Sequence, residues 1–160
     1  MSTENYKISG MKNLFIREAR IIDAEKIIEF QKMMARETEN ISLDHETIYQ
    51  GVHAVFADPY KGKYYVAEKN NEVIGSLLIT FEWSDWRNSY IWWFQSVYIE
   101  PGSRRKGVFR QMCGHVRETA IQNNVPCLRL YVEKSNTKAQ KTYEEMGMNS
   151  NHYKMYEWLK

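Results

Sequence analysis

Residues 95–109 read QSVYIEPGSRRKGVF, and no other stretch of the chain is as informative. Residues 95–99 are typical of a strand, which Pro101 and Gly102 end. The cations at 104–106 then lead through Gly107 into an apolar pattern with helical spacing. A strand that passes through a glycine-containing loop into a helix brings unpaired N–H groups and the positive end of the helix dipole together, which favours a diphosphate.

Two better-known phosphate motifs are missing from this stretch. A P-loop would read GxxxxGK[ST] and a dinucleotide fold GxGxxG, and neither occurs. Taken alone, the run from Arg104 to Lys106 is explained equally well as a solvated charged surface.

Working outward, the hydrophobic pattern predicts a mixed sheet with helices on both faces, an α/β (α+β) fold class. A strand, a helix and a strand near the C-terminal end imply a parallel crossover attached to an antiparallel meander. The expected order is β α α β β β α β α β. Strands are predicted at 14–17, 63–68, 73–82, 90–99, 126–132 and 152–159; helices are predicted from Asp23, from Asp44 to Asp58, over 109–120 and from Ser135 or Asn136 to Met146.

Length and charge exclude several classes of protein. The 160 residues predict one domain over 1–160 with a loose start at 1–10. The net charge of +2 argues against a protein that mainly binds nucleic acid. The chain has no apolar run long enough for a membrane span, and its start does not resemble a signal peptide. Cys113 and Cys127 form no CxxC pair, so the sequence predicts no metal site and a cytoplasmic location.

A second motif, NTKAQKTYEEMGM at residues 136–148, favours the interpretation of the first as a phosphate-binding loop. Together the two resemble the GCN5-related N-acetyltransferase family, whose phosphate loop reads [QR]xxGx[GA] and whose next helix reads NxxAxxxYxxxGF. The resemblance spans about residues 14–158. It implies an acetyl-CoA-dependent acyltransferase.

The resemblance also implies where acetyl-CoA would bind. Backbone groups of Val97, Tyr98 and Ile99 would pair with the pantetheine arm as a further strand would. Amides from Arg104 or Arg105 through Lys106, Gly107 and Val108 to Phe109 would hold the pyrophosphate. Asn136 would bond to the cofactor, although helix capping alone would explain an Asn there.

Two further positions concern the chemistry. Tyr143 occupies the place of the hydroxyl that protonates the departing thiolate; the alternative is a tyrosine that only packs beneath its helix. Phe109 departs from the family pattern, because Gly or Ala usually stands there. The departure leaves the geometry of the pyrophosphate loop open.

The general base is not evident from the pattern. Many relatives have a carboxylate in the central strand where this chain has Gln95 and Ser96. Glu82 is the first candidate, with Glu37 or Glu39 as others and Glu100 less favoured. A water chain held by Gln95 is the alternative.

Carboxylates and indoles alternate in residues 82–88, EWSDWRN. Glu82, Trp83, Asp85 and Trp86 offer charge and cation–π faces to a small primary amine, polyamine-like or amino-acid-like. This tract loosely resembles a hairpin of diamine acetyltransferases; the tryptophans could equally brace a hairpin.

Two other functions are alternatives to a small-molecule acetyltransferase. They are a non-catalytic CoA-binding sensor or partner module and a peptide or protein N-acetyltransferase. A homodimer is compatible with Met146, Met148 and Met155.

Overall fold

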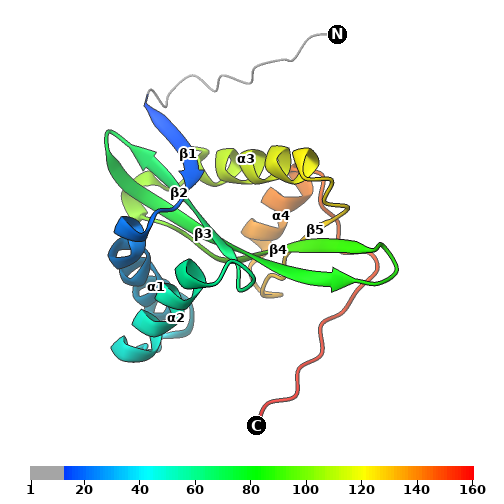
Figure 1. The fold of residues 1–160 in the computed structure, drawn as a ribbon, viewed down its shortest axis with the longest axis horizontal. Helices are drawn as coiled ribbons and strands as arrows, with labels where there is room; N and C mark the ends of the chain where they lie inside the picture. Colours follow the sequence, from blue (N-terminus) through cyan, green and yellow to red (C-terminus); the bar gives the residue numbers. More distant parts are fainter. Residues whose placement is uncertain (1–12) are drawn as a thin grey trace.

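The computed structural model describes residues 13–160, so the predicted loose segment 1–10 lies outside the described residues. The chain forms one five-stranded sheet in the order β1-β2-β3-β4-β5 (Figure 1). Neighbouring strands are antiparallel except β4 and β5, which are parallel. The predicted mixed sheet is therefore confirmed. The strands are β1 (Leu14–Glu18), β2 (Lys63–Lys69), β3 (Glu72–Ser84), β4 (Ser89–Ile99) and β5 (Leu128–Arg129).

Four helices pack on the two faces of this sheet. The crossover between the parallel strands β4 and β5 contains α3, on the face opposite α1 and α2 (Figure 1). Asp44 begins α2 as predicted, because its carboxylate accepts a hydrogen bond from the Thr47 amide at 2.8 Å. The helices are α1 (Ala24–Glu39), α2 (His45–Ala57), α3 (Val108–Gln122) and α4 (Thr137–Glu145).

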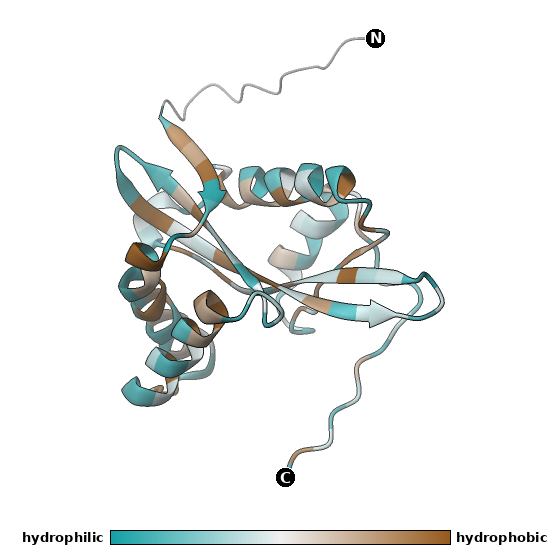
Figure 2. Ribbon diagram, in the orientation of Figure 1, coloured by the Kyte–Doolittle hydropathy of each residue, from teal (hydrophilic) through white to brown (hydrophobic). Residues whose placement is uncertain are grey.

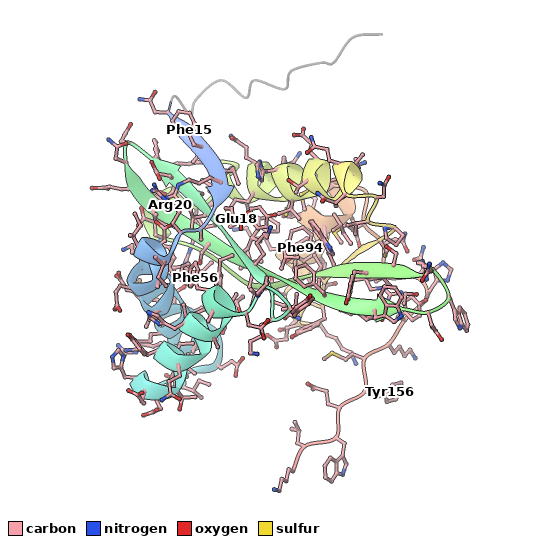
Figure 3. All side chains as sticks on the ribbon, in the orientation of Figure 1. Phe15, Glu18, Arg20, Phe56, Phe94 and Tyr156 are labelled. Carbon is pink, nitrogen blue, oxygen red and sulfur yellow. The ribbon has the colours of Figure 1, made fainter. Side chains whose placement is uncertain are left out.

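Each face of the sheet has its own hydrophobic core, and apolar segments run along the strands in Figure 2. Beneath α3, buried side chains of β3 and β4 meet Met112 and Val116. Phe94, labelled in Figure 3, belongs to this core. On the other face, Ile27 and Ile28 of α1 and Val52 of α2 pack on Tyr64 and Val66. Burial on both faces explains why β2, β3 and β4 are so rich in apolar residues.

A β-bulge interrupts β4 in the middle. Ser76 of β3 lies opposite Tyr98, whereas Leu78 lies opposite Gln95, so β4 contains one extra residue. Ser96 adopts a positive φ of 48° there. The bulge reverses the alternation of side chains: Phe94 faces the α3 core, and Tyr98 instead contacts Phe30 of α1.

The edge of β4 that faces β5 is paired over only part of its length. Trp92 lies opposite Leu128 and Trp93 opposite Arg129, and the pairing then stops. Among residues 13–160, no strand lies beside residues 94–99 on that edge. We call the space between residues 94–99 and the segment that follows β5 the β4–β5 opening.

Two predicted strands differ from the structure. The strand expected over 126–132 is shorter in the structure, because only Leu128–Arg129 pair with β4. The strand expected over 152–159 is wrong: these residues form no strand, and the end of the chain runs away from the sheet, with Tyr156 exposed (Figures 1 and 3). The physical reason is that a strand needs a ladder, and this segment pairs with none of the strands in the described sheet.

Candidate active site

The loop between β4 and α3 exposes a row of backbone N–H groups. Arg105 and Gly107 both have positive φ values, 63° and 81°. The N–H groups of residues 105–110 donate to no acceptor within the described part of the chain, and the first helical bond runs from Gln111 to Gly107 at 3.1 Å. Adjacent amides in turn conformations form a concavity that binds anions. The local geometry therefore suits a diphosphate at the N-terminus of α3.

Two cationic side chains of this loop form hydrogen bonds within the protein, unlike the backbone amides of residues 105–110. Arg104 donates from Nε to the Ile99 carbonyl at 2.7 Å and from Nη2 to Glu37 at 2.7 Å. Lys106 donates to the Gly102 carbonyl at 2.6 Å. Both side chains therefore hold the loop in shape. The Arg105 side chain has no hydrogen-bond partner among residues 13–160 and is exposed.

Glu37 lies at the junction of α1, β4 and this loop. Its second oxygen accepts from the Tyr98 hydroxyl at 2.8 Å, and the Arg104 guanidinium lies 5.1 Å from the Tyr98 ring centre. The Tyr98 hydrogen bond and Arg104 hold the pKa of Glu37 below its usual range. Burial and Glu37 raise the pKa of Tyr98 to about 12. Glu37, a predicted substrate residue, thus has both oxygens engaged inside the protein.

Tyr143 is held on the α3 face by Phe109. Their rings meet edge to face, with centroids 5.7 Å apart and planes at 70°. Phe109 packs against the α3 core, so its side chain does not occupy the concavity formed by the amides. Burial, and to a smaller degree Cys113, raises the pKa of Tyr143, which keeps the hydroxyl protonated at neutral pH.

The structure also explains Cys113 and Asn136. Burial raises the pKa of the Cys113 thiol to about 12, so this cysteine is a poor nucleophile at neutral pH. Asn136 caps α4, because its side-chain oxygen accepts from the Ala139 amide at 3.1 Å. The Asn136 side-chain N–H groups donate to no acceptor within residues 13–160.

Side chains on the α1 side of the sheet form a second group, which we call the polar cluster: Glu82, Trp93, Gln95, Arg129 and Tyr131. Trp93 donates from Nε1 to Glu82 at 2.5 Å, and Arg129 donates to both Glu82 oxygens at 3.2 and 3.3 Å. The Tyr131 hydroxyl donates to Gln95 at 2.9 Å, across the start of the β4–β5 opening.

Arg129 and Tyr131 are members of this cluster that sequence reasoning did not select. The signal was present, because alternation with Leu128 and Leu130 places Arg129 and Tyr131 on one face of the predicted strand. What the pattern did not contain was their partners on β3 and β4. Those partners became evident only with the register of the sheet.

The predicted hairpin residues do not join the cluster. Trp83 faces the opposite side of β3 from Glu82 and packs edge to face on Tyr90, with centroids 5.1 Å apart. Trp86 lies at the tip of the hairpin and is 93% exposed. The Asp85 carboxylate accepts from the Trp86 amide within the turn. The structure therefore brings Glu82 and Gln95 into the polar cluster but leaves Trp83, Asp85 and Trp86 outside it.

Within residues 13–160, no three His, Cys, Asp or Glu side chains are arranged to hold a metal ion. No helix in the same range combines the length and apolarity of a membrane span.

The geometry defines a class of protein. An open strand edge lies beside a helix N-terminus with free amides, an arrangement suited to a pantetheine arm and its diphosphate, and a protonated tyrosine lies on the same face as that helix. These are the parts of a CoA-dependent acyltransferase. The chain belongs to the acetyltransferase (GNAT) family, whose model matches residues 24–148. Acetyl-CoA is the acyl donor of this family.

Solved structures agree with this assignment. A "possible acetyltransferase" from Clostridium difficile 630 is 40% identical, with a TM-score of 0.85 over 92% of this chain and 98% of that one. A "predicted acetyltransferase with acetyl-CoA" from Clostridium acetobutylicum is 20% identical, with a TM-score of 0.71 over 92% and 94%.

A third structure shares the fold at lower identity. AAC(6')-Iy, in complex with the bisubstrate analogue CoA-S-monomethyl-acetylneamine, is 12% identical, with a TM-score of 0.77 over 93% of this chain and 99% of that one. Among curated proteins, none matches the chain.

Proposed function

We propose that this acetyltransferase moves the acetyl group of acetyl-CoA to a primary amine of a small molecule, polyamine-like or amino-acid-like, by direct attack. The observation that carries the proposal is the division of groups between the two faces of the sheet. Tyr143 lies on the α3 face and the polar cluster on the α1 face. An acid on one face and an acceptor site on the other suit a single transfer step without an enzyme-bound acyl group.

Backbone groups would hold the donor. The unpaired edge at Val97, Tyr98 and Ile99 would pair with the pantetheine arm. The amides of residues 105–109 would bind the diphosphate, aided by the exposed Arg105 side chain. Asn136 would contribute its free N–H groups. A backbone N–H on the β4 edge would polarise the thioester carbonyl.

Tyr143 supplies the proton for the leaving group. In the transfer, the amine nitrogen forms a bond to the acyl carbon and the carbon–sulfur bond breaks. The hydroxyl of Tyr143 gives its proton to the departing sulfur, producing free CoA thiol and an N-acetyl product. Because burial raises the pKa of Tyr143 further above neutrality, its hydroxyl carries the proton that this step requires.

Glu82 receives the proton that the attacking amine releases. Its oxygens face Trp93 and Arg129 and remain partly exposed, so an amine or an intervening water has access. Gln95 cannot accept a proton at neutral pH and instead orients water or acceptor through its amide. A carboxylate beside aromatic rings attracts an ammonium group before the reaction.

The neighbouring AAC(6')-Iy complex supports the size of the proposed acceptor. Its bisubstrate analogue joins CoA to acetylneamine. At 12% identity this likeness concerns the fold alone, and it indicates that the fold has room for a small amine. The polar cluster of this chain is the argument for the acceptor itself.

Location and assembly are extensions of the proposal. The cytoplasmic location expected from the sequence stays a prediction. A homodimer would be formed through the C-terminal segment, where Met155, Tyr156, Trp158 and Leu159 are exposed. Met146 packs instead against the α3 core. Sedimentation of the full chain and of a variant lacking residues 152–160 tests the dimer, which only the full chain should form.

The experiment that tests the proposed function has two stages. A thermal shift with acetyl-CoA should show stabilisation that increases with concentration. Release of CoA thiol is then followed over polyamines, amino acids, aminoglycosides and peptide N-termini, and the products are identified by mass. Turnover of small amines supports the proposal. Turnover of peptides alone would contradict the acceptor class, and binding without any turnover would contradict transfer to amines.

A further inference from the structure

Arg129 has hydrogen-bonding capacity that the protein does not use. Its Nη1 group donates to Glu82, but Nε and Nη2 donate to no acceptor anywhere in residues 13–160. The side chain is only 22% exposed. Its Cζ atom lies 5.8 Å from the centre of the Trp93 ring and 5.1 Å from that of Tyr153. Aromatic contacts and Glu82 therefore hold a planar guanidinium whose remaining donors form a fork suited to a carboxylate.

The charges of the polar cluster limit what it binds well. The opposite charges of Glu82 and Arg129 cancel, so the polar cluster does not strongly attract a purely cationic molecule. A diamine or polyamine would gain attraction from Glu82 and meet repulsion from Arg129. A molecule with an ammonium group and a carboxylate would satisfy both residues.

Arg129 also has a suitable position for recognising the acceptor. It is the last residue of β5 and lies opposite Trp93, where the pairing with β4 ends. The hydrogen bond between Tyr131 and Gln95 crosses the opening immediately beyond it. A carboxylate bound by Arg129 would therefore lie where the opening begins.

We propose that the acceptor carries a carboxylate as well as the amine, and that Arg129 binds this carboxylate. The inference rests on the proposed function and narrows its acceptor from small amines in general to amino-acid-like molecules. Glu82 faces the ammonium group and Arg129 the carboxylate. Arg129 is thus a specificity-determining residue.

The test uses paired acceptors in which the carboxylate is replaced, by an amide in one pair and by a second amine in the other. Free α-amino acids are compared with their amides, and 4-aminobutanoate is compared with 1,4-diaminobutane. For the wild-type chain we expect kcat/KM for the acids to exceed that for their partners by about tenfold or more, as for the loss of a charge-assisted hydrogen bond. In Arg129→Gln this ratio should fall toward one.

Arg117→Gln provides the matched control. Arg117 is exposed on α3, on the other face of the sheet, so the same substitution there should keep the ratio of acid to amide. The wild-type ratio is informative even if Arg129→Gln fails to fold. Faster acetylation of amides and diamines than of acids would overturn the carboxylate and leave the proposed function standing. Acetyl-CoA binding without acetylation of any amine would overturn both.

Discussion

The ring of Phe109 meets the ring of Tyr143 edge to face, with centroids 5.7 Å apart. Phe109 belongs to the first turn of α3, whose amides face the proposed diphosphate site, and Tyr143 belongs to α4. One contact therefore joins the helix that would hold the cofactor to the residue that would protonate its thiolate. Phe109 departs from the usual Gly or Ala of the motif, and its side chain has a structural use beside Tyr143.

Tyr143→Phe should lower kcat by roughly a hundredfold, because the proton donor is lost while the ring contact with Phe109 remains. Acetyl-CoA affinity should stay the same. Steady-state kinetics and a binding titration measure the two effects. Tyr60→Phe, in an exposed loop, is the control and should behave as wild type. An unchanged kcat in Tyr143→Phe would remove Tyr143 from the acid role.

Phe109→Ala should lower kcat several-fold, because an aromatic pair contributes about 0.5–1.5 kcal/mol beyond its burial. The substitution leaves the Tyr143 hydroxyl in place but removes its lateral support. Combined with Tyr143→Phe it should add little further loss in kcat, since both act through the same hydroxyl. Independent, additive losses in the double variant would show that Phe109 does not position Tyr143.

Gly107→Glu should weaken acetyl-CoA binding by more than about tenfold, as expected when a carboxylate faces a diphosphate. The positive φ of 81° adds backbone strain for any side chain. Gly114→Glu adds the same charge at an exposed position of α3 with open space around it and should leave affinity unchanged. Binding is measured by calorimetry on folded protein, with folding checked by circular dichroism. Equal affinities for the two variants would place the diphosphate elsewhere.

Arg104→Ala should raise the KM for acetyl-CoA several-fold, because the Ile99 carbonyl and Glu37 lose their shared donor and the loop loses its shape. Arg104→Lys keeps the charge but not the planar fork, so it should resemble Arg104→Ala. Initial rates at varied acetyl-CoA concentration measure the effect. Full recovery of KM in the Lys variant would mean that Arg104 acts by charge alone.

Asp23→Asn should reduce the free energy of unfolding at pH 7 by about 1.5–3 kcal/mol. Burial opposes ionisation of Asp23, but hydrogen bonds from Arg17 and from the Arg20 amide outweigh it, so the pKa lies below its ordinary value. Its contribution is therefore present above the unfolded pKa of about 3.9 and is lost as pH falls through the folded pKa. Urea unfolding at pH 7 and near pH 3 measures the difference, which should shrink in acid. A difference that is independent of pH would contradict the ionic origin.

Much of the fold could be predicted because the hydrophobic pattern of each helix or strand reflects how that element is buried. The strands predicted over 63–68, 73–82 and 90–99 correspond to β2, β3 and β4, and differ from them only by one or two residues at their ends. Alternating or continuous apolar residues reflect burial on one face or two, which the local pattern contains. The segment 152–159 has the composition of a strand. It forms none because no neighbouring strand pairs with it, although its residues favour strand structure.

The site could be predicted less completely. The motif around Gly107 predicted the exposed amides, since a strand followed by a glycine loop and a helix is a local arrangement. The contact between Arg104 and Glu37 joins residues 67 positions apart, and no local pattern contains it. Arg104 could therefore be expected near a phosphate, whereas the structure shows its side chain bracing the loop.

By itself, the sequence determined the order of elements from β1 to α4, the helix N-terminus with its free amides and the presence of Tyr143 on the following helix. These depend on neighbours within a few residues. Only the tertiary structure decided which side chains share a face around the β4–β5 opening. The bulge at Ser96 reverses the alternation of β4, and the register with β5 brings Arg129 to Glu82 and Tyr131 to Gln95. Faces and partners follow from strand pairing over long separations, because one extra residue in a strand exchanges its two sides.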